Sequence, residues 1–354
     1  MTFITPNKVL GHLDRLAAWQ RGEKPAPVTV EWDLSNRCYL GCGYCHFAHT
    51  HTKGPWASKR RLLPTAWEGT GDLADVAIVK RALGDMAAAG VQGIVWSGGG
   101  EPTVHPQWLE VVDYAGQCGF KQGMYTAAGL LTQPAAAVLA SLASWVVVSL
   151  DAADRESYRS EKGVDGFEKA CQGARWLSQS RGASIGVSFL LHERNWPRAE
   201  EMLDLGRSLG ATYVTFRPTI ETTPDRASVC VGDRSWITAA LPVLERLSLE
   251  PDVECQPSRF AAYRDWQGRS YDACYGVRVN ATITPDGRVW LCPQRRGIVG
   301  SEIGDLRTES FAELWARHPG QWTDFTDCRV MCRLHLMNET LAHVFAPHQH
   351  EAFV

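Results

Sequence analysis

The chain has 354 residues, of which 45% are hydrophobic, so it can bury one large core or a core with a smaller satellite module. The net charge is -3 and no block of Lys or Arg stands out, which argues against a nucleic-acid partner and against an anionic membrane surface. No apolar run reaches the roughly 18 residues of a membrane-spanning helix, and no signal-peptide pattern is present at the N-terminus. We therefore expect a cytoplasmic protein whose 11 cysteines stay reduced and bind metal where they cluster.

Strand-like and helix-like patterns alternate along the first two thirds of the chain. The predicted strands cover residues 28–34, 91–98, 120–127, 144–151, 184–191 and 212–218. Helical periodicity follows over residues 72–90, 107–119, 134–143, 166–181 and 197–209. This alternation predicts a parallel sheet covered by helices. Periodicity does not distinguish a partly closed barrel from an open doubly wound sheet, but in both the functional site lies at the carboxyl ends of the strands.

The alternation of strand-like and helix-like patterns ends at about residue 250. Residues 277–292 read as two short strands joined by a Pro-Asp-Gly turn, and residues 309–318 as a short helix. We therefore expect an N-terminal extension (1–27), a barrel (28–249), a small α+β module (250–340) and a C-terminal tail (341–354). His343, His348 and His350 are expected in a closing helix and the tail rather than in a metal site.

Three cysteines, Cys38, Cys42 and Cys45, follow the first predicted strand in the sequence CYLGCGYC. A loop can wrap three thiolates around one inorganic centre. A four-iron cluster normally takes four cysteines, so three would leave one iron open to a ligand from outside the protein. The alternative is a zinc ion completed by His46, His49 or His51. The single run of cysteines favours the iron–sulfur cluster, because a zinc knuckle normally has two ligand pairs separated by a longer insert.

CxxxCxxC after the first strand of an α/β barrel, with the aromatic Tyr44 before the last cysteine, resembles the radical S-adenosylmethionine (radical SAM) enzymes. The resemblance implies a partial (β/α)6 TIM-like barrel and a [4Fe–4S] cluster whose open iron binds S-adenosylmethionine (SAM). It implies that one electron splits SAM into methionine and a 5'-deoxyadenosyl radical, which abstracts hydrogen from a substrate. An external electron donor such as flavodoxin or ferredoxin is implied as well.

A second motif agrees with this resemblance. Residues 97–106, SGGGEPTVHP, follow the second predicted strand. Glycine allows close approach of the backbone to a ligand, and a glutamate can accept hydrogen bonds from an ammonium group. In radical SAM enzymes a Gly-Gly-Glu-Pro segment at this place holds the amino group of SAM. The resemblance therefore assigns to SAM binding the residues Gly98, Gly99, Gly100, Glu101 and Pro102.

The fourth predicted strand ends in VVVSLDAADRESYR, residues 146–159. In related enzymes a serine of this strand and a downstream arginine contact the ribose or carboxylate of SAM, which implies these roles for Ser149 and Arg159. The chain departs from the family after the third strand. Many relatives have Thr-Asn-Gly-x-Leu-Leu there and this chain has YTAAGLL (125–131), so contacts through that asparagine are not expected.

Four further cysteines, Cys274, Cys292, Cys328 and Cys332, lie in the second module and would saturate another cluster. The predicted hairpin brings the first two together, and the last two share one face if their segment is helical. The pattern resembles the twitch module, a short form of the SPASM extension with one auxiliary [4Fe–4S] cluster. The alternative is a structural zinc site.

A saturated cluster suits electron transfer, which fits a two-electron oxidation. In the family such dehydrogenases act on hydroxyls of sugars and aminocyclitols, so the main expectation is dehydrogenation of a small sugar-, aminocyclitol- or nucleoside-like substrate. Arg217, Glu221 and His192 are positionally plausible in its site, and the general base is not identified. One alternative is epimerisation with Cys255 as hydrogen donor.

Radical modification of a peptide, by a cross-link or a thioether, is another alternative. It ranks lower because many such enzymes carry a peptide-binding domain before the barrel, whereas about 27 residues precede the first strand here. A zinc protein without enzymatic activity would leave the Gly-Gly-Glu-Pro match unexplained.

Overall fold

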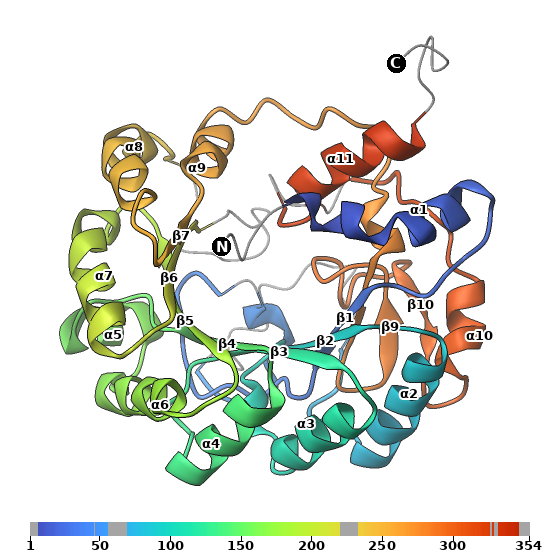
Figure 1. Ribbon diagram of the computed structural model, residues 1–354, viewed down its shortest axis with the longest axis horizontal. Helices are drawn as coiled ribbons and strands as arrows, with labels where there is room; N and C mark the ends of the chain where they lie inside the picture. Colours follow the sequence, from blue (N-terminus) through green and yellow to red (C-terminus); the bar gives the residue numbers. More distant parts are fainter. Residues whose placement is uncertain are drawn as a thin grey trace.

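The computed structural model describes residues 6–45, 47–55, 69–219, 233–325, 328 and 332–346. Within them a single sheet of ten strands runs in the order β10-β9-β8-β1-β2-β3-β4-β5-β6-β7. The sheet curves into an open ring with helices on its outer side (Figure 1). Neighbouring strands are parallel from β8 through β1 to β7. The expected partial barrel is confirmed. Its strands are β1 (Thr29–Asp33), β2 (Gly93–Ser97), β3 (Lys121–Thr126), β4 (Trp145–Ser149), β5 (Ser184–Leu191) and β6 (Tyr213–Pro218).

The outer helices coincide with the predicted ranges to within one helical turn. They are α2 (Val76–Ala88), α3 (Trp108–Gln117), α4 (Gln133–Leu142), α6 (Phe167–Gln179) and α7 (Ala199–Ser208), followed by α8 (Trp236–Leu247) after β6. Their starts have local causes: Asp75 accepts hydrogen bonds from two backbone N–H groups at the start of α2, and Thr132 does so from one in α4. Periodicity did not reveal α5 (Arg155–Lys162), a polar helix that begins at a capping box of Asp154 and Ser157.

The strands separate apolar from polar side chains. In β1, Val30 and Trp32 are fully buried in the main core between sheet and helices. The alternate residues Glu31 and Asp33 are also buried, and both pair with Arg296 of the second module. Because successive residues of a strand face opposite sides of the sheet, the polar face of β1 lies inside the ring. At β1 the interior of the barrel is therefore lined by charged side chains.

The second module continues the barrel sheet. Its hairpin, β8 (Asn280–Ile283) and β9 (Arg288–Trp290), is antiparallel as predicted, and β10 (Glu302–Asp305) extends it. At the other end β7 (Val253–Cys255) pairs with β6, so the sheet runs past the expected barrel limit at residue 249. The remaining α-helices of the described residues are α1 (Leu13–Gln20), which follows the 3-10 helix η1 (Pro6–His12), and α9 (Pro257–Arg264), α10 (Phe311–Ala316) and α11 (His335–Phe345).

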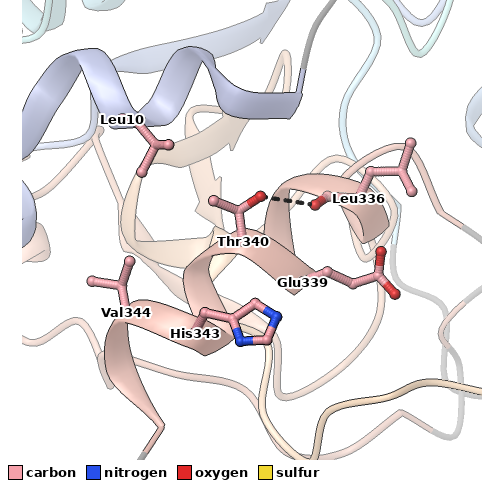
Figure 2. A pocket seen from close by; sticks show the side chains of 6 residues that line it. All are labelled: Leu10, Leu336, Glu339, Thr340, His343 and Val344. Atoms are coloured by element: carbon pink, nitrogen blue, oxygen red, sulfur yellow. Dashed lines mark hydrogen bonds between the residues drawn. The ribbon is translucent and has the colours of Figure 1, made fainter. Parts of the chain in front are cut away.

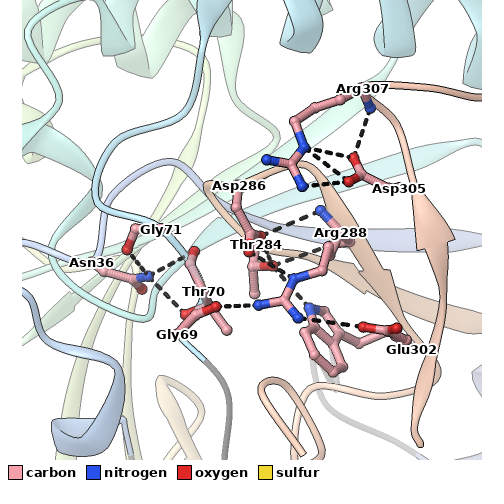
Figure 3. A network of polar contacts seen from close by, with 11 residues as sticks. Asn36, Gly69, Thr70, Gly71, Thr284, Asp286, Arg288, Glu302, Asp305 and Arg307 are labelled. Carbon is pink, nitrogen blue, oxygen red and sulfur yellow. Dashed lines mark hydrogen bonds and ion pairs between the residues drawn. The ribbon is translucent and has the colours of Figure 1, made fainter. Parts of the chain in front are cut away.

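A polar network fixes the hairpin to the barrel near the cysteine loop (Figure 3). The side-chain amide of Asn36 donates to the backbone carbonyl of Thr70 at 3.1 Å and to that of Gly71 at 2.8 Å. Across the interface, the backbone N–H of Asp286 donates to the Thr70 carbonyl at 3.3 Å, and Arg288 donates to the Gly69 carbonyl. The segment 69–71 is thus held between the end of β1 and the β8–β9 turn.

A surface groove lies between η1 and α11, lined by Leu10, Leu336, Glu339, Thr340, His343 and Val344 (Figure 2). It contains none of the predicted site residues, and His343 lies in a helix, as expected. His348 and His350 lie outside the described residues. Among the helices that the structure describes, none combines the length and apolar character needed to cross a membrane.

Candidate active site

A cavity of about 350 Å³ lies inside the ring at the carboxyl ends of the strands. Its volume falls in the range of small-molecule sites. Residues at or near the ends of β2, β3, β4, β5 and β6 line it, including Ser97, Thr126, Ser149, Leu190 and Pro218. Cys38, Cys42 and Cys45 line it from the barrel, and Cys332 lines it from the second module. The two cysteine groups therefore border one shared space.

The first three cysteines sit on a loop held by backbone hydrogen bonds. The N–H of Cys38 donates to the Lys53 carbonyl at 3.3 Å, and that of Cys45 donates to the Cys42 carbonyl at 3.1 Å. Burial raises the pKa of the Cys38 thiol, and the charges of Cys42 and Cys45 raise that pKa further. Buried thiols this close to one another repel as thiolates, so the arrangement fits a positively charged metal centre that takes up their charge.

The second set of cysteines also converges. The charges of Cys292, Cys332 and Cys328 each add to the effect of burial in raising the pKa of Cys274. Cys274, Cys292 and Cys332 pack in one small apolar cluster with Val277, Leu291 and Leu334. This donor set fits a saturated cluster in an apolar shell.

The zinc alternative at the first cysteines needs a histidine as a fourth ligand. His51 Nε2 lies 3.9 Å from Cys45 Sγ, whereas His46 and the His49 side chain lie outside the described residues.

Tyr44 is anchored by a buried ion pair that the sequence did not reveal. Its hydroxyl donates to Asp151 Oδ2 at 2.8 Å, and Lys162 Nζ donates to the same oxygen. The other carboxylate oxygen accepts from the N–H of Leu190 at 2.7 Å. Burial would lower the pKa of Lys162, but the charges of Asp151, Cys42 and Tyr158 and the hydrogen bond to Asp151 together outweigh it and the pKa is raised. Lys162 therefore stays protonated. It lines the cavity near Cys42, and its positive charge favours the thiolate form of that cysteine.

Gly99 and Gly100 pack against the base of the cysteine loop, and Gly98 packs against Gly100. A Cβ on Gly99 would lie 1.8 Å from Asn36 Oδ1, and one on Gly100 would lie 2.2 Å from the carbonyl oxygen of Arg37. A Cβ on Gly98 would lie 1.8 Å from the Gly100 carbonyl oxygen. Side chains are thus excluded by the protein itself, and not only by a ligand. All three glycines and Pro102 line the cavity.

Glu101 is buried, lines the cavity and is held by four donors. Its Oε1 accepts from the hydroxyls of Thr103 and Thr126, both at 2.6 Å, and from the N–H of Thr103 at 3.3 Å. Its Oε2 accepts from the N–H of Ala127 at 2.9 Å. The charge of Glu101 also acts on Cys38, so the carboxylate lies near the first cysteines. A fixed carboxylate at this place can bind an ammonium group.

Ser149 and Arg159 differ in position. Ser149 lines the cavity, and its hydroxyl donates to Asp151 Oδ2 at 3.2 Å. Arg159 is exposed on α5 and is not among the residues around the cavity. The cation that reaches the cavity from this helix is Lys162, about one turn further along.

The remaining candidates are placed as follows. Cys255 packs against the main core at the end of β7 and does not line the cavity; burial raises its pKa to about 12. His192 is buried, lies 2.9 Å from Glu161 Oε2 and does not line the cavity either. Arg217 does line it. Glu221 lies outside the described residues.

A cluster of charged side chains between the two modules was also not predicted from the sequence. Arg296 pairs with Asp33 Oδ2 at 2.5 Å and with Glu31 Oε2 at 3.2 Å, and Arg333 pairs with Glu31. Burial raises the pKa of Asp33 to about 6 although Arg296 opposes it. This cluster joins β1 to the segment that carries Cys332. The sequence gives no local signal for it, because its members lie at opposite ends of the chain.

The fold and the site define a partial barrel with two groups of cysteines at one cavity. Residues 32–206 match the Radical SAM superfamily, and residues 274–335 match the iron-sulfur cluster-binding domain SPASM. The chain belongs to the radical SAM superfamily and carries a SPASM domain. It accordingly binds SAM and two [4Fe–4S] clusters.

Similar proteins cover most of the chain. The PqqA peptide cyclase of Methylobacterium sp. (strain 4-46) is 26% identical over 310 residues, which are 83% of this chain and 74% of that protein. The AdoMet-dependent heme synthase of Methanosarcina barkeri is 24% identical and covers 82% of each. Streptococcus suis SuiB bound to S-adenosylmethionine has the same fold, with a TM-score of 0.65, 15% identity, and 89% of this chain and 72% of SuiB covered. Native anSMEcpe with bound AdoMet gives a TM-score of 0.59 at 15% identity, over 82% of this chain and 81% of the other.

Proposed function

We propose that this enzyme modifies a peptide by radical chemistry, joining two of its side-chain positions by a cross-link or a thioether. The observation that carries the proposal is the single cavity bordered by Cys38, Cys42 and Cys45 and by Cys332, which would place a substrate between two iron–sulfur centres. The similarity to PqqA peptide cyclases, over 83% of the chain, supports a peptide as substrate.

The residues around the cavity have distinct proposed roles. When bound, SAM and the cluster on the first three cysteines supply the radical that removes hydrogen, and the second cluster supplies an electron acceptor. Glu101 would hold the SAM ammonium group, with the glycine segment shaping the wall beside it. Ser149 and Lys162 would contact the ribose or carboxylate of SAM. Tyr44, fixed by Asp151, would keep the cysteine loop in place.

The other reactions expected from the sequence have less support. Dehydrogenation of a sugar-like hydroxyl fits a saturated second cluster, but the peptide cyclases favour a peptide. Epimerisation with Cys255 as hydrogen donor lacks a geometric basis, because Cys255 does not line the cavity. We therefore place peptide modification first. Flavodoxin or ferredoxin is proposed as the electron donor.

Mass spectrometry can test this proposal. The reconstituted enzyme is incubated without oxygen with SAM, a reductant and a pool of synthetic peptides, and in parallel with a pool of sugars and aminocyclitols. We expect SAM-dependent peptide products lighter by the mass of two hydrogen atoms, with the two side-chain positions joined in fragment spectra. Products only in the sugar pool would contradict the proposal. The variant with Cys38, Cys42 and Cys45 replaced by Ala should give no product in either pool.

A further inference from the structure

The charged groups around the cavity are unevenly paired. Among the described residues that line it, Glu101 is the single carboxylate, whereas Lys162, Arg217, Arg259 and Arg333 are cations. Lys162 is paired with Asp151, and Arg333 is paired with Glu31. Arg217 and Arg259 are left without a carboxylate partner within the described part of the chain.

The guanidinium group of Arg217, at the end of β6, has a hydrogen-bond partner, but no carboxylate of the described residues neutralises its charge. Its Nη1 donates to the hydroxyl of Tyr125 at 3.3 Å, and its guanidinium carbon lies 5.6 Å from the centre of that ring. Its Nε is buried and has no hydrogen-bond partner. Since the Tyr125 oxygen accepts from Arg217, the Tyr125 O–H remains available to donate to a ligand. Burial would raise the pKa of Tyr125, but the charge and the hydrogen bond of Arg217, together with the charge of Arg333, outweigh it and the pKa is lowered.

Arg259, on α9, lies close enough to Arg217 for their charges to interact. Burial, together with the charges of Arg217 and Arg333, lowers its pKa to about 10. Arg217 and Arg259 also line a second, small gap beside the main cavity, and the carboxylate that lines this gap, Glu254, does not line the main cavity. The charge of Cys332 acts on Arg259, so this pair lies on the side of the second module, whereas Glu101 lies near Cys38. Two partly buried like charges with no ion-pair partner among the described residues are costly, and an anionic ligand would offset that cost.

We propose that Arg217, Arg259 and the Tyr125 hydroxyl form a binding site for a carboxylate of the substrate. Guanidinium groups bind carboxylates through paired, charge-assisted hydrogen bonds, and the phenol adds a third donor. The inference rests on the proposed function, and it narrows the substrate to a peptide that presents an acidic side chain or its C-terminal carboxylate on the Cys332 side of the cavity.

Isothermal titration of the reconstituted, SAM-bound full-length enzyme tests this site with small probes. The probes are N-acetyl-glutamate N-methylamide for an acidic side chain, N-acetyl-alanine for a C-terminal carboxylate, and N-acetyl-glutamine N-methylamide as the neutral match. We expect one carboxylate probe to bind at least about tenfold more tightly than the neutral probe, and which one it is identifies the source of the carboxylate. Arg217→Met and Arg259→Met should each remove that preference.

Controls separate binding from folding and from cluster chemistry. Arg264→Met changes the same helix at a position paired with Asp265, and it should leave probe affinity unchanged. Iron content and the SAM-induced change in the EPR spectrum should be the same in all variants as in the wild type. If Arg217→Met does not fold, Arg217→Lys should still weaken carboxylate binding, because lysine lacks the paired N–H donors of the guanidinium group.

Three results would overturn the inference: equal affinity for the glutamate, alanine and glutamine probes; tighter binding of inorganic phosphate than of either carboxylate; or arginine variants that shift the auxiliary-cluster EPR signal and keep their probe affinity. Since these measurements need no turnover, an enzyme that binds the carboxylate but modifies no peptide contradicts the proposed function alone. An enzyme that modifies peptides without this preference contradicts the inference alone.

Discussion

Replacement of Glu101 by Gln should weaken SAM binding with little loss of stability. Glutamine keeps the size of the side chain, and its carbonyl oxygen can still accept from the N–H of Ala127. The amide NH2 group then faces the hydroxyls of Thr103 and Thr126, which can rotate to accept, and only the long 3.3 Å hydrogen bond from the Thr103 N–H loses its acceptor. The shape of the site is therefore preserved, and the negative charge is removed.

The size of the effect follows from the lost charge. A hydrogen bond to a charged group contributes about 1.5–3 kcal/mol, so the dissociation constant for SAM should rise by roughly 10- to 150-fold. The assay is a SAM titration of the reduced, reconstituted enzyme followed by the EPR spectrum of the first cluster. Glu110→Gln, on the exposed face of α3, is the matched control and should bind like the wild type. If Glu101→Gln has full iron content and an unchanged SAM affinity, then Glu101 does not hold the ammonium group.

Three further predictions follow from individual contacts. Gly99→Ala should destabilise the protein by about 1–3 kcal/mol in anaerobic urea unfolding and weaken SAM binding, because its Cβ would meet Asn36 Oδ1 at 1.8 Å. Gly84→Ala, at a position with open space around the Cβ and no positive φ, is the control and should cause neither loss. Lys162→Met should weaken SAM binding more than Arg159→Met, since Lys162 lines the cavity and Arg159 is exposed; equal losses would contradict the placement. Burial lowers the pKa of His318 to about 3, so the imidazole takes up a proton on unfolding, and stability is lost as pH falls below about 6.5. Between pH 7.5 and pH 5 the free energy of unfolding of the wild type should fall by about 2 kcal/mol more than that of His318→Gln. His343→Gln, at an exposed position, is the control. Parallel pH profiles for the wild type and His318→Gln would refute this prediction.

The barrel and both cysteine groups could be predicted because their signals are local in the sequence. Each strand of the barrel is a short segment with buried apolar residues, and each motif of the first two strands follows a strand end, where the parallel sheet gathers it into one cavity. The hairpin at residues 277–292 has its own turn signal in Pro285–Gly287, and Gly287 has a positive φ of 83°.

The ion pairs of the site could not be predicted, because they join residues distant in sequence. Lys162 belongs to the polar segment RSEK and looks like a surface residue until α5 brings it to Asp151. The same holds for Arg333 and Glu31, which are joined only when the second module adds its strands to the barrel sheet. Arg159 was assigned from the resemblance and Cys255 as a candidate hydrogen donor between the two modules, and neither residue lines the cavity.

The measurement that tests the account most directly is the EPR spectrum of the reduced, oxygen-protected enzyme before and after addition of SAM, combined with an iron determination. With three cysteines at one cluster and four at the other, we expect about eight irons per chain, a spectrum that changes on adding SAM, and release of 5'-deoxyadenosine. Replacing Cys38, Cys42 and Cys45 by Ala should leave about four irons and abolish both the spectral change and the product. A wild-type spectrum that SAM does not alter would contradict the open iron at these three cysteines.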